Sequence, residues 1–260
     1  MKGDNMTEVN DPSLWWKQAV VYQVYPRSFK DSRGEGLGQI AGVTEKIGYL
    51  KELGVDAIWL SPFYPSQLAD GGYDVDDYRN VDPKLGTMDD FDALAKAAHA
   101  DGIKIVVDIV PNHSSNLHEW FKAALAAKPG SPERDRYIFR DGKGPNGDEP
   151  PTNWQNHFGG PAWTRVPDGQ WYLHMFTKEQ PDWNWKNEDV RADFIKTLRF
   201  WLDHGADGFR VDVAHGLAKD LDRDDLDDYV VWCTNDQPED GSHPVIDRDE
   251  VHDIYHEWRK

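Results

Sequence analysis

Apolar residues along the chain follow two alternating spacings, which predict strands and helices in turn. Continuous apolar runs rich in β-branched and aromatic residues are typical of buried strands and occur at 19–26, 56–63, 103–112 and 208–214. Apolar positions three or four residues apart predict helices and occur over 42–53, 89–101 and 190–205. Because these predicted strands and helices alternate, they indicate a parallel α/β fold.

The alternation stops between the third and fourth predicted strands. This stretch is rich in Pro, Gly, Asn and Trp, so we predict an inserted subdomain over 114–188. The flanking ranges 1–113 and 189–260 would form part of a (β/α)8 TIM barrel. A complete barrel needs about 250 residues without such an insertion, and the pattern supplies only about four β/α units. We therefore expect the first half of a larger barrel, and hence a fragment.

Composition limits the classes of function. Of the 260 residues, 38% are hydrophobic and 12% aromatic, which is enough for a sizeable core. The net charge of -18 argues against nucleic acid or an anionic membrane as a partner and favours a neutral ligand. No signal sequence or membrane-length apolar run is present, so we expect a cytoplasmic protein. The single cysteine, Cys233, is expected to be structural. The oligomeric state is left open.

Polar side chains stand where the third and fourth predicted strands end. Asp108, Asn112 and His113 close the third strand, and Arg210 and Asp212 close the fourth. In TIM barrels the chemistry lies at these C-terminal strand ends. Residues two apart in a strand face the same side, and a carboxylate beside a guanidinium stays ionised, as a nucleophile must. From these residues alone, a nucleophile and a structural ion pair are both open.

Five motifs follow one another along the chain: YQVYPRSF (22–29), DGGYDV (70–75), DIVPNH (108–113), QPDWNW (180–185) and GFRVDVAHG (208–216). Together they resemble the α-amylase superfamily, glycoside hydrolase family 13. The resemblance covers essentially the whole chain. QPDWNW is close to the QPDLNW of the oligo-1,6-glucosidase and α-glucosidase branch, so the resemblance implies a retaining α-glucosidase.

The resemblance also implies a role for individual residues. Asp212 would attack the anomeric carbon and form a β-glucosyl ester, and Arg210 would keep it charged and oriented. His113 would donate to the 6-hydroxyl of the non-reducing glucose. Asp70 would bind its 4-hydroxyl and Tyr73 would stack on its face, which closes the pocket and implies an exo-acting enzyme.

Two residues, Asp108 and Asn112, would support this site through hydrogen bonds. A retaining mechanism also needs a second carboxyl group roughly 5 Å from the nucleophile. In the family this is a glutamate that ends a fifth strand, and the chain does not contain that strand. Glu250 and Glu257 lie in no strand-end motif, so we assign neither of them this role. The isolated chain is therefore expected to be inactive.

The segment 31–42 occupies the place of a calcium loop in many relatives, with the form D-x-N-x-D-G-x-G-D. Asp31 is kept, but Arg33 stands in the asparagine position, Glu35 replaces an aspartate and Gln39 replaces the last carboxylate. The guanidinium of Arg33 could supply the positive charge of the ion. We therefore expect no calcium, no other metal and no cofactor.

The substrate is expected to be a small oligosaccharide or disaccharide. In this branch, Val213 after the nucleophile favours α-1,6 bonds, whereas DVAHG also resembles enzymes that act on maltose, so the linkage stays open. A transglycosylating relative, of the trehalose synthase or sucrose isomerase type, is the main alternative. A non-catalytic barrel homologue is disfavoured because Asp212, Arg210 and His113 are all present.

Two further stretches receive structural interpretations. The acidic segment 220–228 is expected to be a solvated helix face or a loop, not a metal site. Aromatic residues of the insertion could line the aglycone side of a sugar site, but most are expected to form a small core of the insertion: Trp154, Phe158, Trp163, Trp171 and Trp183.

Overall fold

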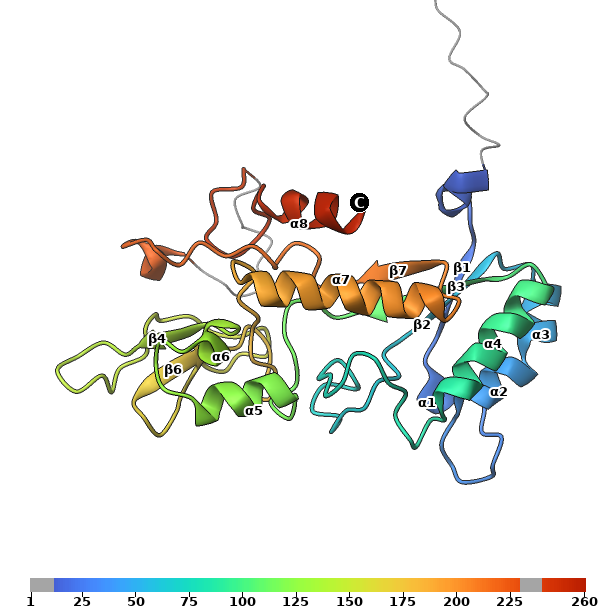
Figure 1. The fold of residues 1–260 in the computed structure, drawn as a ribbon, viewed down its shortest axis with the longest axis horizontal. Coiled ribbons are helices and arrows are strands. Elements are labelled where there is room, and N and C mark those ends of the chain that lie inside the picture. Colours follow the sequence, from blue (N-terminus) through green and yellow to red (C-terminus); the bar gives the residue numbers. More distant parts are fainter. Residues whose placement is uncertain (1–11, 230–239) are drawn as a thin grey trace, which may run out of the picture.

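The computed structural model describes residues 12–229 and 240–260, so the interpretation of Cys233 lies outside it. A short 3-10 helix, η2 (Pro12–Lys17), precedes the main sheet. The sheet has four parallel strands in the order β1 (Val21–Val24), β2 (Ala57–Leu60), β3 (Lys104–Ile109) and β7 (Gly208–Val211) (Figure 1). Each strand lies within one of the predicted apolar runs. The sheet is part of a TIM barrel that does not close.

Helices follow each strand of this sheet along the chain. They are α1 (Pro26–Phe29), α2 (Ile40–Glu45), α3 (Ile47–Leu53), α4 (Met88–Ala100), α7 (Glu188–Asp203) and, after β7, α8 (Val251–Trp258). The helix α4 begins with a capping box in which Thr87 and Asp90 satisfy each other's backbone N–H groups. Asn187 caps α7 through its side-chain oxygen. These caps fix where α4 and α7 start.

The predicted helix over 42–53 is two helices, α2 and α3, which meet at Lys46. Lys46 has φ -103° and ψ 4°, outside the helical range. Val43 and Ile47 are buried on either side of the kink. Because the apolar spacing runs through the kink unchanged, the sequence pattern does not register it.

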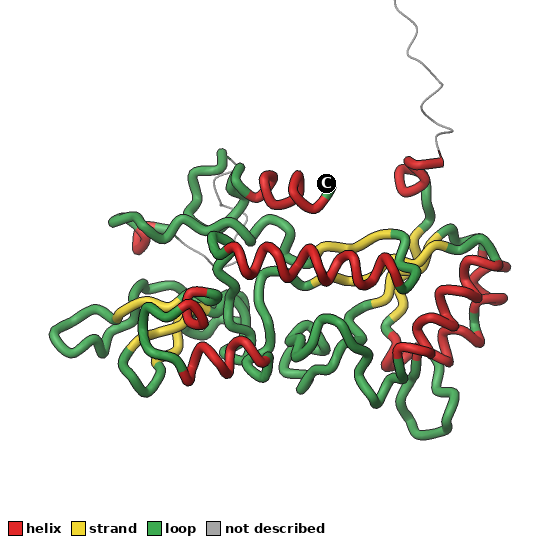
Figure 2. Tube along the Cα trace, in the orientation of Figure 1, coloured by secondary structure: helices red, strands yellow, loops and turns green. Residues whose placement is uncertain are grey.

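The segment between β3 and α7 carries its own secondary structure, seen as loops with short strands and helices in Figure 2. It holds two helices and an antiparallel sheet: α5 (Glu119–Ala126), α6 (Pro132–Asp135), and strands β4 (Phe139–Asp141), β6 (Gln170–Leu173) and β5 (Trp163–Arg165) in the order β4-β6-β5. Trp154 and Trp163 lie in a small hydrophobic cluster here, whereas Trp183 joins the main core. Phe158 is 59% exposed and belongs to neither core.

The inner face of the main sheet is partly open. Val21 is 48% exposed, and a hollow of about 560 Å³ is lined by Val21, Trp59, Val106 and Arg210, among others. In a closed barrel, side chains from the remaining strands fill this space.

Within the described residues, no helix is long and apolar enough to cross a bilayer.

Candidate active site

Asp212 and Asp108 share one guanidinium at the C-terminal ends of β3 and β7. Asp108 and Arg210 are register partners in the two strands, and Asp212 follows directly after β7. Arg210 Nη1 lies 2.5 Å from Asp212 Oδ1, and 3.2 and 3.3 Å from Asp108 Oδ1 and Oδ2. The guanidinium also lies 4.9 Å from the ring centroid of Trp59. The strand register therefore brings all three charged groups together, and the spacing had predicted a shared face for Arg210 and Asp212.

Asp108 is fully buried and accepts several hydrogen bonds. Trp59 Nε1 donates to Asp108 Oδ2 at 3.0 Å, and the Tyr73 hydroxyl donates to the same oxygen at 3.2 Å. Burial raises the pKa of Asp108 to about 7, against the opposing effect of Arg210. Burial alone would lower the pKa of Arg210, but Asp108 and Asp212 together raise it. Asp108 thus orients Arg210 and Tyr73 from a position that solvent does not reach.

The DGGY turn places Asp70 and Tyr73 beside the strand ends. The buried carboxylate of Asp74 accepts from the backbone N–H groups of Ala69 at 3.1 Å and Asp70 at 3.0 Å, which fixes the turn. Gly72 has φ +110°, and a Cβ there would lie 3.1 Å from Pro62 O. Only glycine adopts this conformation without strain.

His113 and Asn112 lie behind the DGGY turn in a buried network. His113 Nε2 is 3.2 Å from Tyr73 O, and Asn112 Nδ2 is 3.1 Å from His113 Nδ1. Gln180 Nε2 donates to Asp70 Oδ2 at 3.0 Å and lies 2.9 Å from His113 Nε2. Burial lowers the pKa of His113. Gln180 therefore links Asp70 to His113.

All of the predicted site residues are linked by direct contacts or through Gln180: Asp70, Tyr73, Asp108, Asn112, His113, Arg210 and Asp212. Sequence reasoning assigned no role to Gln180, Asp182 or Lys219. Gln180 and Asp182 stand in the QPDWNW motif, which could have pointed to them as site residues. Lys219 lies in a loop after β7, and no sequence motif points to it.

The chain turns sharply after the predicted nucleophile. Asp212 N still donates to Ile109 O at 2.8 Å, as a continuation of the strand pairing. Val213 then adopts φ +48°, which is strained for a β-branched residue. A Cβ at Gly216 would lie 2.9 Å from Val213 Cγ1. The turn thus begins at Asp212, whose side chain still contacts Arg210.

The loop at 31–39 surrounds the Asp31 carboxylate with backbone N–H groups. Asp31 Oδ1 accepts from the backbone N–H groups of Arg33 at 3.0 Å and Gly34 at 2.7 Å, and Asp31 Oδ2 accepts from that of Gly36 at 2.7 Å. These bonds, above all that from Gly36, lower the pKa of Asp31 to about 2. Gln39 Oε1 accepts from Ser32 N at 2.8 Å. Both carboxylate oxygens of Asp31 therefore accept hydrogen bonds from backbone N–H groups.

The charge compensation differs from the sequence expectation in one respect. The Arg33 guanidinium lies 4.0 Å from Glu35, and both side chains are exposed. Arg33 contacts Asp31 only through its backbone N–H. The compensation for Asp31 comes from the backbone because the tight loop aims successive N–H groups at one carboxylate.

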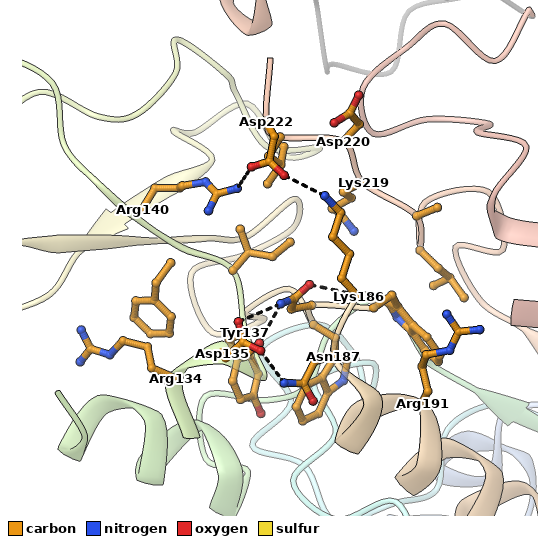
Figure 3. A pocket seen from close by; sticks show the side chains of 18 of the residues that line it. Arg134, Asp135, Tyr137, Arg140, Lys186, Asn187, Arg191, Lys219, Asp220 and Asp222 are labelled. Atoms are coloured by element: carbon orange, nitrogen blue, oxygen red, sulfur yellow. Dashed lines mark hydrogen bonds and ion pairs between the residues drawn. The ribbon is translucent and has the colours of Figure 1, made fainter. Parts of the chain in front are cut away.

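The acidic segment 220–228 lies against the β4-β6-β5 sheet and the start of α7. Asp222 pairs with Arg140 and Lys186 at 2.9 Å each. These pairs lie at a cavity of about 1060 Å³ that is also lined by Lys219 and Asp135 (Figure 3). Neither Asp212 nor His113 lines this cavity. Its charges are largely paired with one another, so we do not assign a ligand to it.

The chain is similar to known proteins in both sequence and fold. The family model described as "Alpha amylase, catalytic domain" matches residues 23–260. The chain belongs to the alpha-amylase family. An oligo-1,6-glucosidase of Heyndrickxia coagulans is 50% identical over 214 residues, which are 82% of this chain and 38% of that protein.

Two solved structures of the alpha-amylase family are similar in fold. The trehalose-6-phosphate hydrolase of Bacillus licheniformis has a TM-score of 0.82 at 44% identity. The trehalulose synthase of Pseudomonas mesoacidophila has a TM-score of 0.82 at 44% identity. Each similarity covers 94% of this chain and 42% of the other chain. The chain thus spans about two fifths of the length of these relatives.

Proposed function

We propose that this chain supplies the nucleophile half of a retaining, exo-acting α-glucosidase. The observation that carries the proposal is the Asp212–Arg210 contact of 2.5 Å at the open mouth of the partial barrel. The Asp212 side chain is 15% exposed, whereas that of Asp108 is fully buried. Of these two carboxylates, only Asp212 is placed to reach a ligand. The oligo-1,6-glucosidase similarity supports a glucosidic substrate.

The proposed first step forms one bond and breaks another. A carboxylate oxygen of Asp212 attacks the anomeric carbon, while the bond from that carbon to the glycosidic oxygen breaks. The departing oxygen takes a proton from an acid, and water later hydrolyses the ester. Arg210 orients Asp212 through their ion pair. Glu250 and Glu257 pair with Arg248 and Arg191, and neither contacts Asp212. We assign the acid to the rest of a complete barrel.

The substrate is proposed to be a disaccharide or short oligosaccharide with a non-reducing glucose. Asp70 and His113 line one side of the Tyr73 turn, where they would bind hydroxyl groups of that sugar. The geometry does not choose between α-1,4 and α-1,6 linkages. The similarity to a trehalulose synthase keeps a second candidate, in which the glucosyl ester passes to a sugar hydroxyl and not to water. The nucleophile is the same in both reactions.

We also propose that the 31–39 loop is ordered without calcium. The backbone bonds to Asp31 and the Ser32–Gln39 bond support this, because they occupy the oxygen atoms that a hard cation would need.

A chimera tests the proposed function. This chain would replace the matching N-terminal part of the H. coagulans oligo-1,6-glucosidase, which supplies the remaining strands. We expect the chimera to release glucose from isomaltose or maltose. The Asp212→Asn variant should lose at least about a thousandfold in kcat/KM. A folded chimera in which Asp212→Asn keeps the parental activity would contradict the proposal. Sugar transfer in place of hydrolysis would favour the second candidate.

A further inference from the structure

A buried ion pair lies directly behind His113. Lys219 Nζ is 3.1 Å from Asp182 Oδ2, and the two side chains are 4% and 0% exposed. Lys219 also donates to Asn112 Oδ1 at 2.8 Å and to Gly216 O at 2.6 Å. The ammonium therefore joins the loop after β7 to the end of β3 and to the QPDWNW segment.

The ion pair determines which way the Asn112 amide points. An ammonium group has N–H donors and no acceptor, so Asn112 Oδ1 must face Lys219. The amide nitrogen then faces Asp182 Oδ1 at 3.3 Å and His113 Nδ1 at 3.1 Å. A reversed amide would set its NH₂ group against the ammonium and its oxygen against the carboxylate. Both charged residues thus favour the same orientation.

This orientation constrains the proton of the imidazole. A neutral histidine has one donor and one acceptor nitrogen, and burial favours the neutral form of His113 by lowering its pKa. Because Asn112 presents an N–H donor to His113 Nδ1, that nitrogen must accept. His113 Nε2 faces the carbonyl oxygen of Tyr73 at 3.2 Å, which accepts. Both contacts require the proton on Nε2.

One contact favours the opposite tautomer. Gln180 Nε2 lies 2.9 Å from His113 Nε2, and Thr177 N and Oγ1 hold the Gln180 oxygen at 3.0 Å each. An unprotonated Nε2 would accept from Gln180, but it would then face the Tyr73 carbonyl, and Nδ1–H would face the Asn112 amide. Two contacts stand against one. The Asn112 orientation also rests on charge-assisted bonds, which are about twice as strong as neutral ones.

We propose that the Lys219–Asp182 ion pair positions His113 by fixing the Asn112 amide, which holds the imidazole proton on Nε2. Lys219 and Asp182 are positioning residues because they act through Asn112. A donor at Nε2 lies on the side of Asp70 and Gln180. That it would serve a sugar hydroxyl rests on the proposed function, whereas the tautomer is a property of the free protein.

The tautomer is measured by ¹⁵N NMR on the whole chain with ¹⁵N-labelled histidine. The chain has ten histidines, so the His113 signals are assigned by their loss in His113→Gln. We expect Nδ1 to resonate as an unprotonated nitrogen and Nε2 as a protonated one. The reverse pattern in the parent protein would overturn the proposal whatever the outcome of any activity assay.

The role of the ion pair is tested with Lys219→Met. We expect the His113 Nδ1 signal to move toward the protonated position, because Gln180 then competes with a less constrained Asn112. The matched control is Lys186→Met, which removes a lysine from the same cavity without touching Asn112, and it should leave His113 unchanged. Lys219→Arg, which retains a cation, should restore the parental pattern at least in part.

If Lys219→Met does not fold, Lys219→Met/Asp182→Leu replaces it, because the double variant leaves no uncompensated buried charge. The same movement of the Nδ1 signal is expected. An unchanged His113 spectrum in either folded variant would overturn the positioning role. A failed glucosidase assay beside the expected spectra would count against the proposed function alone.

Discussion

Arg210 Nη1 lies 2.5 Å from Asp212 Oδ1 and 3.2 Å from Asp108 Oδ1, so one nitrogen serves two carboxylates that differ in exposure. Asp108 orients the guanidinium from within the barrel wall, and Asp212 presents an oxygen to the open mouth. An ion pair that only stabilised the fold would not need its second carboxylate to be exposed. This asymmetry is the main reason for assigning the chemistry to Asp212.

The first prediction concerns Arg210→Lys. A lysine keeps the charge but lacks the rigid, planar guanidinium whose Nη1 contacts both carboxylates and which lies over the Trp59 ring. In the chimera we expect kcat/KM to fall by about a hundredfold or more while the fold is kept. Steady-state kinetics and far-UV circular dichroism measure the two quantities. Arg191→Lys is the control, because Arg191 pairs with Glu257 away from Asp212. Equal losses in both variants would contradict a specific role for Arg210.

The second prediction concerns the pH dependence of stability. The folded pKa of Asp108 is about 7 against an ordinary value of 3.8, so the native state binds its proton more tightly than the unfolded state. This contribution to the free energy of unfolding is complete below about pH 4 and is lost as the pH rises through 7. Between these two pH values the free energy of unfolding falls by up to about 1.4 kcal/mol per pH unit.

Urea denaturation of the chain and of Asp108→Asn between pH 4.5 and 7.5 measures this contribution. The asparagine cannot titrate, so the stability of the parent should decline with rising pH relative to that of the variant. Parallel curves for the two proteins would show that Asp108 does not titrate in this range.

The third prediction concerns the 31–39 loop. The melting temperature of the chain should not change when calcium or a chelator is added. The variant Arg33→Asn/Glu35→Asp/Gln39→Asp, which restores the oxygen ligands of the relatives, should gain a calcium-dependent increase in melting temperature. Differential scanning fluorimetry measures both. A calcium response in the parent chain would refute the proposed metal independence.

The fourth prediction concerns the DGGY turn. Gly72→Ala combines a positive φ with a 3.1 Å approach to Pro62 O, whereas Gly54→Ala has a positive φ in open space. The alanine at 54 should cost about 1 kcal/mol of unfolding free energy, and the alanine at 72 should cost more, up to about 3 kcal/mol. Denaturant titration measures both. Equal costs would mean that Pro62 gives way freely.

Local sequence spacing was sufficient for the strand ends and not for the network behind them. Arg210 and Asp212 are two residues apart, and strand periodicity places both side chains on one face. Asn112 and Lys219 are 107 positions apart, and His113 and Gln180 are 67 apart. Such pairs depend on how the inserted segment and the loop after β7 fold back on the sheet, which no local pattern encodes.

Backbone groups account for the other differences from the sequence expectations. The motif comparison considers side chains alone and suggested that the Arg33 guanidinium could supply the positive charge, whereas backbone N–H groups contact Asp31. The kink at Lys46 is likewise a property of backbone angles that leaves the apolar spacing intact. Both features are invisible to patterns of side-chain polarity.

The central claim is that Asp212 forms a covalent bond to glucose, and trapping that bond tests it most directly. The chimera would be incubated with 5-fluoro-α-glucosyl fluoride, whose fluoride departs without a general acid, and then digested for peptide mass spectrometry. We predict a fluoroglucosyl adduct on Asp212 that is absent from Asp212→Asn. A folded, active chimera labelled at another carboxylate, or hydrolysing its substrate with no labelling at all, would contradict the account.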